Sequence, residues 1–392
     1  MSARLFTNAR LVCPAQGVSQ GSLLIRDGRI AEIGAVTAPS DATTTDLAGA
    51  TLAPGIVDLG VFAVDRPAFR AGGITRAATM PGVSGERDDD ALMLHRIVPA
   101  VVGNDLFEMA AARGRGAVAV STGRTWVADS GLMRRAMAYT AALGLPVVSH
   151  AEDAGLIGDA VATDGATASR LGLSSAPAAA EAMAVMRDLA LAEVTGAQVH
   201  FRQVTTAAAL DIIRGAKKRG MPVTCGITPA HLLLSDIALE DFRTFAKLSP
   251  PLRSEADRQA CLRAVADGTI DVICSGHDPR GPEDKRLPFA EADAGASGAE
   301  TLLALALGLV RDDLISIDRL FALLSANPAK VMKLQAGTLE PDMPADLIVV
   351  DEGAPWQIDA ERMLARAGNT PFDGLPTQGK VLQLISGGRP IV

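Results

Sequence analysis

The sequence is poor in aromatic residues, in cysteine and in long apolar runs. Aromatic side chains make up 3% of the 392 residues, so alanine, valine, leucine and isoleucine must fill the core. Cys13, Cys225, Cys261 and Cys274 are far apart and form neither a CxxC pair nor a zinc-finger spacing, so we expect buried, reduced thiols. The longest apolar run, residues 301–310, is about half as long as a membrane span.

The sequence also lacks an excess of positive charge. Lys and Arg number 37 against 45 Asp and Glu, which gives a formal net charge of −8. An acidic chain has no electrostatic reason to bind nucleic acid or an anionic membrane surface, so we expect neither partner. The first residues show no basic segment followed by an apolar signal core, and we expect a cytoplasmic protein.

Short runs rich in Val and Ile alternate with Ala- and Leu-rich segments of helical character. This alternation is typical of parallel strands with crossover helices, and eight candidate strands favour a TIM-type (β/α)8 barrel within the α/β class. Helices are expected at 129–144 and 254–268, where Asp129 and Ser254 can cap the first turn. The candidate strands are 55–64, 74–80, 116–122, 145–150, 197–204, 221–227, 245–249 and 271–276.

The two ends of the chain lack the strand–helix alternation of the middle. They contain short candidate strands separated by Gly, Pro and Asp. A turn at residues 26–29 suits a hairpin. We therefore predict a small β-sandwich domain built jointly from residues 1–53 and 337–392, beside a barrel over 54–336.

Seven segments, in this order, resemble the dihydroorotase branch of the amidohydrolase superfamily. KLSPPLRSE, GTIDVI and NTPFDG are the most specific of them. The resemblance implies the barrel and the composite β domain already predicted. The segments are TLAPGIVDLGV, SHAED, LSPPLRSEADR, DGTIDVICSGHDP, SANPAKVMKL, PADLIVVD and NTPFDG.

Dihydroorotases open or close a cyclic amide with a zinc-bound hydroxide, which needs several converging His and carboxylate ligands. At the positions that the resemblance assigns to those ligands, His150 is the one ligand-type side chain. We therefore expect no metal, no cofactor and no catalytic residue. The positions hold Gly60 and Phe62 after the first strand, Ser121 and Thr122 after the third, His150 after the fourth, Gln203 after the fifth and Gly276 after the eighth.

The positions that would hold the substrate have changed as well. The family's arginine after the first strand corresponds to Val64, and its two asparagines correspond to Gly82 and Ser249. Catalytic and binding residues are missing together, which predicts a non-catalytic homologue, a pseudoenzyme of pyrimidine biosynthesis.

The resemblance also implies a partner. Some bacterial aspartate transcarbamoylases associate with dihydroorotase-like chains, active or not, so we predict a structural role beside such a catalytic chain. An active cyclic-amide hydrolase with an atypical site, a small-molecule sensor and a homo-oligomer remain as alternatives.

Three local patterns have a functional and a structural interpretation. His150 with Glu152 and Asp153 could be a residual metal site, although their spacing argues against convergence. Ser275 beside His277-Asp278 suggests a triad, yet neighbours on a strand point to opposite faces. His200 is expected to be structural, His231 to lie in a loop or cap, and His95 to lie on a polar surface helix.

Overall fold

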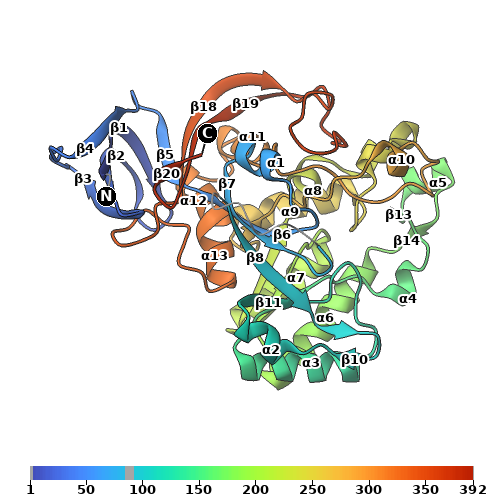
Figure 1. The fold of residues 1–392 in the computed structure, drawn as a ribbon. Coiled ribbons are helices and arrows are strands. Elements are labelled where there is room, and N and C mark those ends of the chain that lie inside the picture. Colours follow the sequence, from blue (N-terminus) through green and yellow to red (C-terminus); the bar gives the residue numbers. More distant parts are fainter. Residues whose placement is uncertain (1–2, 84–91, 392) are drawn as a thin grey trace.

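The computed structural model describes residues 3–83 and 92–391. Eight parallel strands form one sheet in the order β17-β16-β15-β12-β11-β8-β7-β6, which curls into a barrel (Figure 1). Its two outermost strands meet where the Phe62 amide donates to the His277 carbonyl at 2.8 Å. The strands are β6 (Ile56–Val61), β7 (Ile74–Thr79), β8 (Met93–Pro99), β11 (Ala117–Ser121), β12 (Val147–Ser149), β15 (Val199–Phe201), β16 (Val223–Ile227) and β17 (Val272–Ile273).

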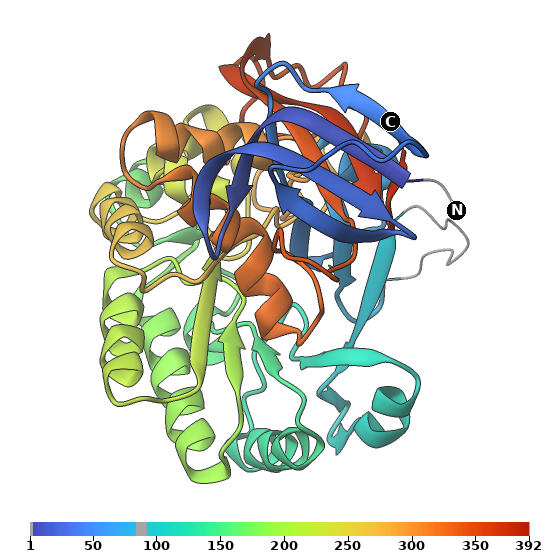
Figure 2. The ribbon, with the colours of Figure 1, turned by 90° about the vertical axis from the view of Figure 1, so that its left-hand side faces the viewer.

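Helices cover the outside of the barrel (Figure 2), and small apolar side chains such as Val57, Ala78 and Val148 fill its inside. The predicted caps of α3 and α9 are confirmed: Asp129 accepts from the Leu132 amide and Ser254 from the Asp257 amide. The helices are α1 (Arg66–Ala71), α2 (Met109–Gly114), α3 (Ser130–Leu143), α4 (Ala154–Ile157), α5 (Ala166–Leu171), α6 (Ala179–Thr195), α7 (Ala207–Lys218), α8 (Pro229–Leu233), α9 (Glu255–Ala266), α10 (Pro282–Lys285), α11 (Leu302–Arg311), α12 (Ile317–Phe321) and α13 (Asn327–Val331).

Both ends of the chain join in a second sheet beside the barrel, which confirms the predicted fold class. The predicted hairpin turn is present, because Asp27 and Gly28 both have positive φ between β2 and β3. The exact boundaries of this domain stay a prediction. Its strands are β1 (Ala3–Cys13), β2 (Gly17–Arg26), β3 (Arg29–Gly34), β4 (Ala42–Asp46), β5 (Thr51–Pro54), β18 (Leu347–Gln357), β19 (Pro376–Ser386) and β20 (Arg389–Pro390).

Two predicted elements are wrong. Residues 245–249 are not a strand: Thr244–Ala246 form one 3-10 turn, and the Lys247 ammonium donates to the carbonyls of Phe289 and Ala290. The barrel strand that the sequence missed is β8, the third along the chain, where the sequence suggested a polar surface helix. The half-buried His95 of β8 has its pKa lowered to about 4 by burial. The partly exposed first half of β8, which contains His95 and Arg96, hid its pairing with β7.

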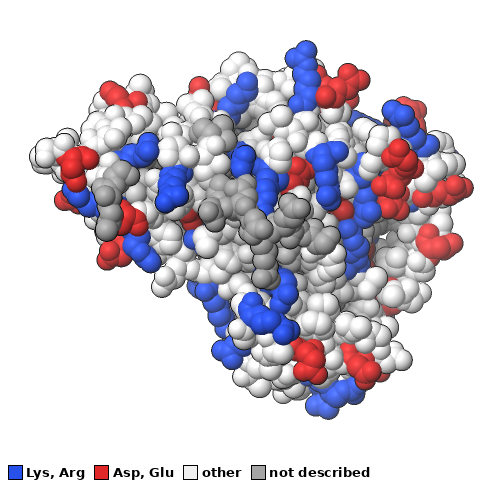
Figure 3. Space-filling model, viewed as in Figure 1, with Lys and Arg blue, Asp and Glu red and all other residues white. Residues whose placement is uncertain are grey.

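The surface carries charges of both signs, and the cysteines are buried and free, as the sequence predicts. Figure 3 shows Lys and Arg interspersed with Asp and Glu over one face. All four cysteines are buried and free, and burial raises the pKa of Cys274 to about 12. Within residues 3–83 and 92–391, no helix is both long and apolar enough to cross a bilayer.

Candidate functional site

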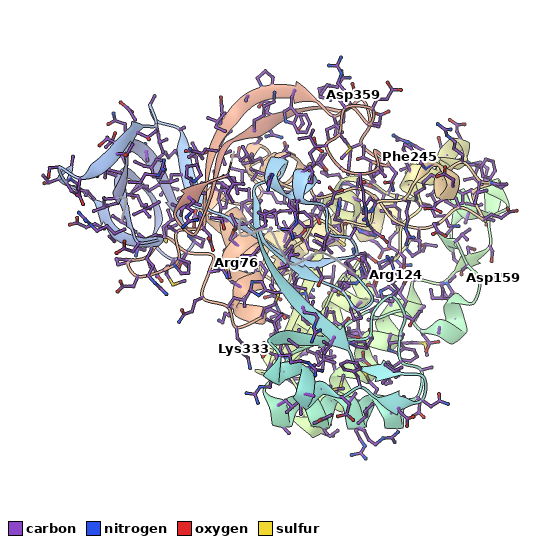
Figure 4. All side chains as sticks on the ribbon, viewed as in Figure 1. Arg76, Arg124, Asp159, Phe245, Lys333 and Asp359 are labelled. Carbon is purple, nitrogen blue, oxygen red and sulfur yellow. The ribbon has the colours of Figure 1, made fainter. Side chains whose placement is uncertain are left out.

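A pocket of about 260 Å³ opens at the carboxyl ends of the barrel strands, the face on which barrel enzymes place their sites. Three arginines line it. Arg124 follows β11, Arg202 follows β15 and Arg280 follows β17. Figure 4 shows Arg124 beyond the strand ends, on the side that faces α4 and β14 (Ser175–Ala176). Asp278 and Asp293 also line the pocket and pair with Arg124 and Arg280.

Arg202 and His150 form the centre of the site. Nη2 of Arg202 lies 2.9 Å from Nδ1 of His150, and Nε2 of His150 lies 3.2 Å from Oε2 of Glu152. Burial lowers the pKa of His150, so the ring is neutral near pH 7, accepting at Nδ1 and donating at Nε2. Burial also lowers the pKa of Arg202, to about 10, which leaves its guanidinium charged.

A buried ion network supports His150 from behind. Oε1 of Glu152 accepts from Nη2 of Arg253 at 2.7 Å, and that nitrogen lies 3.4 Å from Oε2 of Glu181. Despite its burial, the pKa of Glu152 is lowered to about 2, because His150 and Arg253 both favour the carboxylate. Both oxygens of Glu152 are thus occupied.

The structure brings the two glycines at the family's ligand positions close to Arg202 and Gln203. A Cβ on Gly60 would lie 3.6 Å from Cδ of Arg202. A Cβ on Gly276 would lie 3.3 Å from Nε2 of Gln203 and 2.8 Å from Cγ2 of Thr228. Gly60 and Gly276 have φ of +98° and +59°, backbone conformations that favour glycine.

The remaining positions serve the local framework. Phe62 presents its ring to two cations, with Cζ of Arg124 3.9 Å and Cζ of Arg202 4.8 Å from the ring centroid. The Ser121 hydroxyl accepts from the amide of Gly123 at 3.0 Å. The Thr122 hydroxyl accepts from the amide of His150 at 2.9 Å. Both hydroxyls are therefore bonded to the local backbone.

The residues of the suggested metal site and triad bond to other groups in the structure. Asp153 caps α4 by accepting from the amides of Gly155 and Leu156, so it does not join His150 and Glu152.

The Ser275 hydroxyl donates to Asp58, and Asp278 pairs with Arg124. His277 faces Asp65, with Nε2 3.4 Å from Oδ2, so these residues form no triad.

Two other histidines have structural hydrogen bonds, and of the three positions that hold substrate in the family only Ser249 lines the pocket. His200 is buried, with Nδ1 2.9 Å from the Thr224 hydroxyl. His231 lies in α8 and bridges the Thr228 hydroxyl and the Pro250 carbonyl. Ser249 lines the pocket. Val64 packs against the barrel core, and a Cβ on Gly82 would meet nothing within 4 Å.

Sequence reasoning passed over the three arginines. Arg202 occupies a spacer of the family pattern, and Arg280 takes the place of its last histidine. A basic residue shortly after each of three barrel strands was the signal that could have found them, because strand ends converge on one face.

These residues do not fit a hydrolytic zinc ion. Such an ion needs at least three protein ligands from Cys, His, Asp or Glu. The described part of the chain holds no group of three such side chains able to bind a metal. At His150, Nδ1 already accepts from the charged guanidinium of Arg202, which would repel a divalent cation.

Comparisons with known proteins give one consistent family. The profile of the Amidohydrolase family matches residues 97–391. A dihydroorotase of Syntrophotalea carbinolica is 36% identical over 98% of each chain, and one of Anaeromyxobacter dehalogenans is 38% identical over 99% of this chain and 98% of its own.

Solved structures agree on the architecture. L-Hydantoinase (dihydropyrimidinase) from Arthrobacter aurescens has a TM-score of 0.89 at 26% identity, and the match covers 100% of this chain and 96% of that one. D-Hydantoinase from a Bacillus sp. AR9 shares the fold, with a TM-score of 0.88 at 21% identity over 99% and 95% of the two chains.

Proposed function

The chain belongs to the amidohydrolase family and is dihydroorotase-like over its full length, and from this premise we propose that it is a non-hydrolytic member. The observation that carries the proposal is the contact between Arg202 and His150. A guanidinium contacts the one imidazole of the site, while Gly60, Phe62, Gln203 and Gly276 offer no imidazole or carboxylate there. We propose that this guanidinium takes the place of the family's catalytic cation.

A non-hydrolytic barrel can still act through its surface. We propose a structural role as a partner of the aspartate transcarbamoylase catalytic chain in pyrimidine biosynthesis. The support is the family resemblance, since dihydroorotase-like chains associate with some of those enzymes. The described residues form two eight-stranded sheets, and apolar side chains fill the inside of the barrel.

Co-purification tests this role. A tagged copy of the chain should retain the transcarbamoylase of the same cell, and deletion of the chain should reduce the size of the transcarbamoylase assembly on a sizing column. Arg202→Gln should leave retention intact, because Arg202 is 4% exposed. Normal assembly without this chain would sink the partner role.

An active cyclic-amide hydrolase is the second candidate. The names of the relatives, dihydroorotase at 36–38% identity over nearly the whole chain, favour it. It predicts turnover of dihydroorotate to carbamoyl aspartate by purified protein, and bound metal if the family's mechanism operates. The two candidates are thus separated by one assay of activity and metal content.

A further inference from the structure

We infer that residues 282–296 form a strap beside the mouth of the barrel, and that the opening of this strap is coupled to a proton on Lys285. Protonated Lys285 favours the open strap, and neutral Lys285 favours the closed strap of this structure. The inference goes beyond the proposed function, because it concerns access to the pocket and holds with or without a partner chain. It rests on two buried ammonium groups that hold the segment in place.

The strap forms one wall of the pocket. It begins with α10, which follows β17, and its last residues, 293–296, line the cavity. The amide of Asp278 donates to the carbonyl of Ala296 at 2.8 Å, which fixes the end of the strap to the segment that follows β17. Movement of the strap would therefore change how the pocket opens to solvent.

Lys247 holds the middle of the strap. Its Nζ donates to the carbonyls of Phe289 and Ala290 at 2.8 and 2.9 Å. Its backbone carbonyl accepts from the amide of Gly295 at 3.0 Å, near the end of the strap. Figure 4 shows Phe245, from the turn before Lys247, beside α10. The turn and the strap are thus joined at two points.

Lys285, the last residue of α10, holds the strap from within and is 2% exposed. Its Nζ lies 2.7 Å from the carbonyl oxygen of Asp293, 3.0 Å from that of Thr244 and 3.4 Å from that of Lys247. An ammonium has three donors, so these carbonyls use all of them. The hydroxyl of Thr244 donates in return to the carbonyl of Lys285 at 2.7 Å.

Both ammoniums are buried without a bonded carboxylate, since Lys247 is 8% exposed. In the described part of the chain, the hydrogen bonds of both ammoniums go to backbone carbonyls. Burying a charge without a counterion is costly, because carbonyl dipoles replace only part of its hydration. The closed strap therefore holds charge that water would solvate better, and it is poised to open.

The charged groups around Lys285 do not remove this cost. Burial lowers the pKa of Lys285 to about 8, and repulsion from Arg280 and Lys247 contributes. Asp278 and Asp293 oppose the shift, but each of them also pairs with Arg280. Lys285 is thus easier to deprotonate in the closed strap than in water.

The direction of the coupling follows from the two pKa values of Lys285. In an open strap Lys285 would face water, and its pKa would return to the ordinary 10.5. Between about pH 8 and 10.5 the open strap binds a proton that the closed strap does not, so the ratio of open to closed strap falls as the pH rises. The upper limit of this fall is roughly 300-fold, the ratio of the two proton affinities.

Hydrogen exchange of the strap, measured by mass spectrometry from pH 7 to pH 9, tests the inference. The reporters are the amides of Asp293 and Gly295, which donate to the carbonyls of Asp284 and Lys247 in the closed strap. Each exchange rate is divided by that of an unstructured peptide of the same sequence, which removes the intrinsic effect of pH. We expect this ratio to fall at least about threefold over the range. A ratio that stays constant or rises would overturn the inference.

Variants connect the fall to Lys285. Lys285→Arg keeps a charge that does not titrate in this range, and Lys285→Met removes the charge, so each folded variant should lose most of the fall. Either variant suffices if the other does not fold. Lys218→Met, a substitution of an exposed lysine on α7, should keep the fall. An unchanged fall in a folded Lys285 variant would assign the coupling to another group and contradict the inference.

Discussion

Nη2 of Arg202 lies 2.9 Å from Nδ1 of His150, and this contact joins a fixed cation to the one family ligand that the chain retains. Arg202 thus contacts the imidazole that would otherwise be free to bind a metal. It connects the pocket in front, which has excess positive charge, to the buried carboxylates of Glu152 and Glu181 behind.

The first prediction concerns the pKa of His150. The nearby charge of Arg202 lowers this pKa, in addition to burial, so Arg202→Gln should raise it. Titration of the imidazole protons by NMR would measure the shift. Arg134→Gln is the control and should leave the curve in place. A His150 pKa that stays constant when Arg202 is replaced would show that the two groups are not in contact.

The second prediction concerns the buried network. Arg253 is 3% exposed and faces both Glu152 and Glu181. Arg253→Met should lower the free energy of unfolding by roughly 3–5 kcal/mol, because two buried carboxylates lose their counterion. Urea unfolding would measure the loss.

Arg258 with Glu255 supplies the matched control, because the Glu255 side chain is half exposed. Glu255→Gln should cost less than about 1 kcal/mol. Equal losses for Arg253→Met and Glu255→Gln would mean that burial adds nothing to the importance of the network.

The third prediction is a loss of stability in acid. Burial lowers the pKa of His231 from 6.5 to about 4. Between these values the unfolded chain binds a proton that the folded chain does not, so the free energy of unfolding falls as the pH drops from 6.5 and is retained above 6.5. The upper limit of this contribution is about 3 kcal/mol.

Urea unfolding at several pH values checks the third prediction. His231→Gln should lower stability at neutral pH, since two hydrogen bonds are altered. It should also make the decline between pH 6.5 and 4 less steep, while His95, whose pKa is also lowered, continues to contribute. Arg134→Gln should leave that decline unchanged. A decline of the same steepness in His231→Gln would assign it to other groups.

The sequence was sufficient to predict the barrel and the shared sheet domain, because Val- and Ile-rich strands and capped helices are local patterns. It failed at β8, whose partly exposed first half resembles a surface helix. It failed also at Lys247, whose ammonium reaches the carbonyls of the 289–290 segment, while its backbone pairs with no neighbouring barrel strand. Both failures depend on contacts between distant segments.

For the site, the family register alone predicts that Gly60, His150, Gln203 and Gly276 lie at one end of the barrel, and the structure brings them together there. The family register could not predict where the Arg202 side chain points. That direction depends on the space left beside Gly60, which lies on a different strand.

The fourth prediction concerns restoring a lost ligand. Gly276→Asp should destabilise the protein by roughly 1–3 kcal/mol and should gain no zinc, because φ is +59° and the new Cβ would lie 2.8 Å from Cγ2 of Thr228. Gly374→Asp is the control, with a positive φ and no atom within 4 Å of its Cβ position. Its smaller loss would isolate the contact with Thr228. Stoichiometric zinc in Gly276→Asp would contradict the prediction.

Zinc content and turnover, measured on the same preparation, test the central claim most directly. The chain should be produced with added zinc, dialysed against metal-free buffer, and then analysed for bound metal and for hydrolysis of dihydroorotate. The account predicts far less than one zinc per chain and no turnover above a blank. One or two zinc ions per chain, together with turnover that a chelator abolishes, would contradict it.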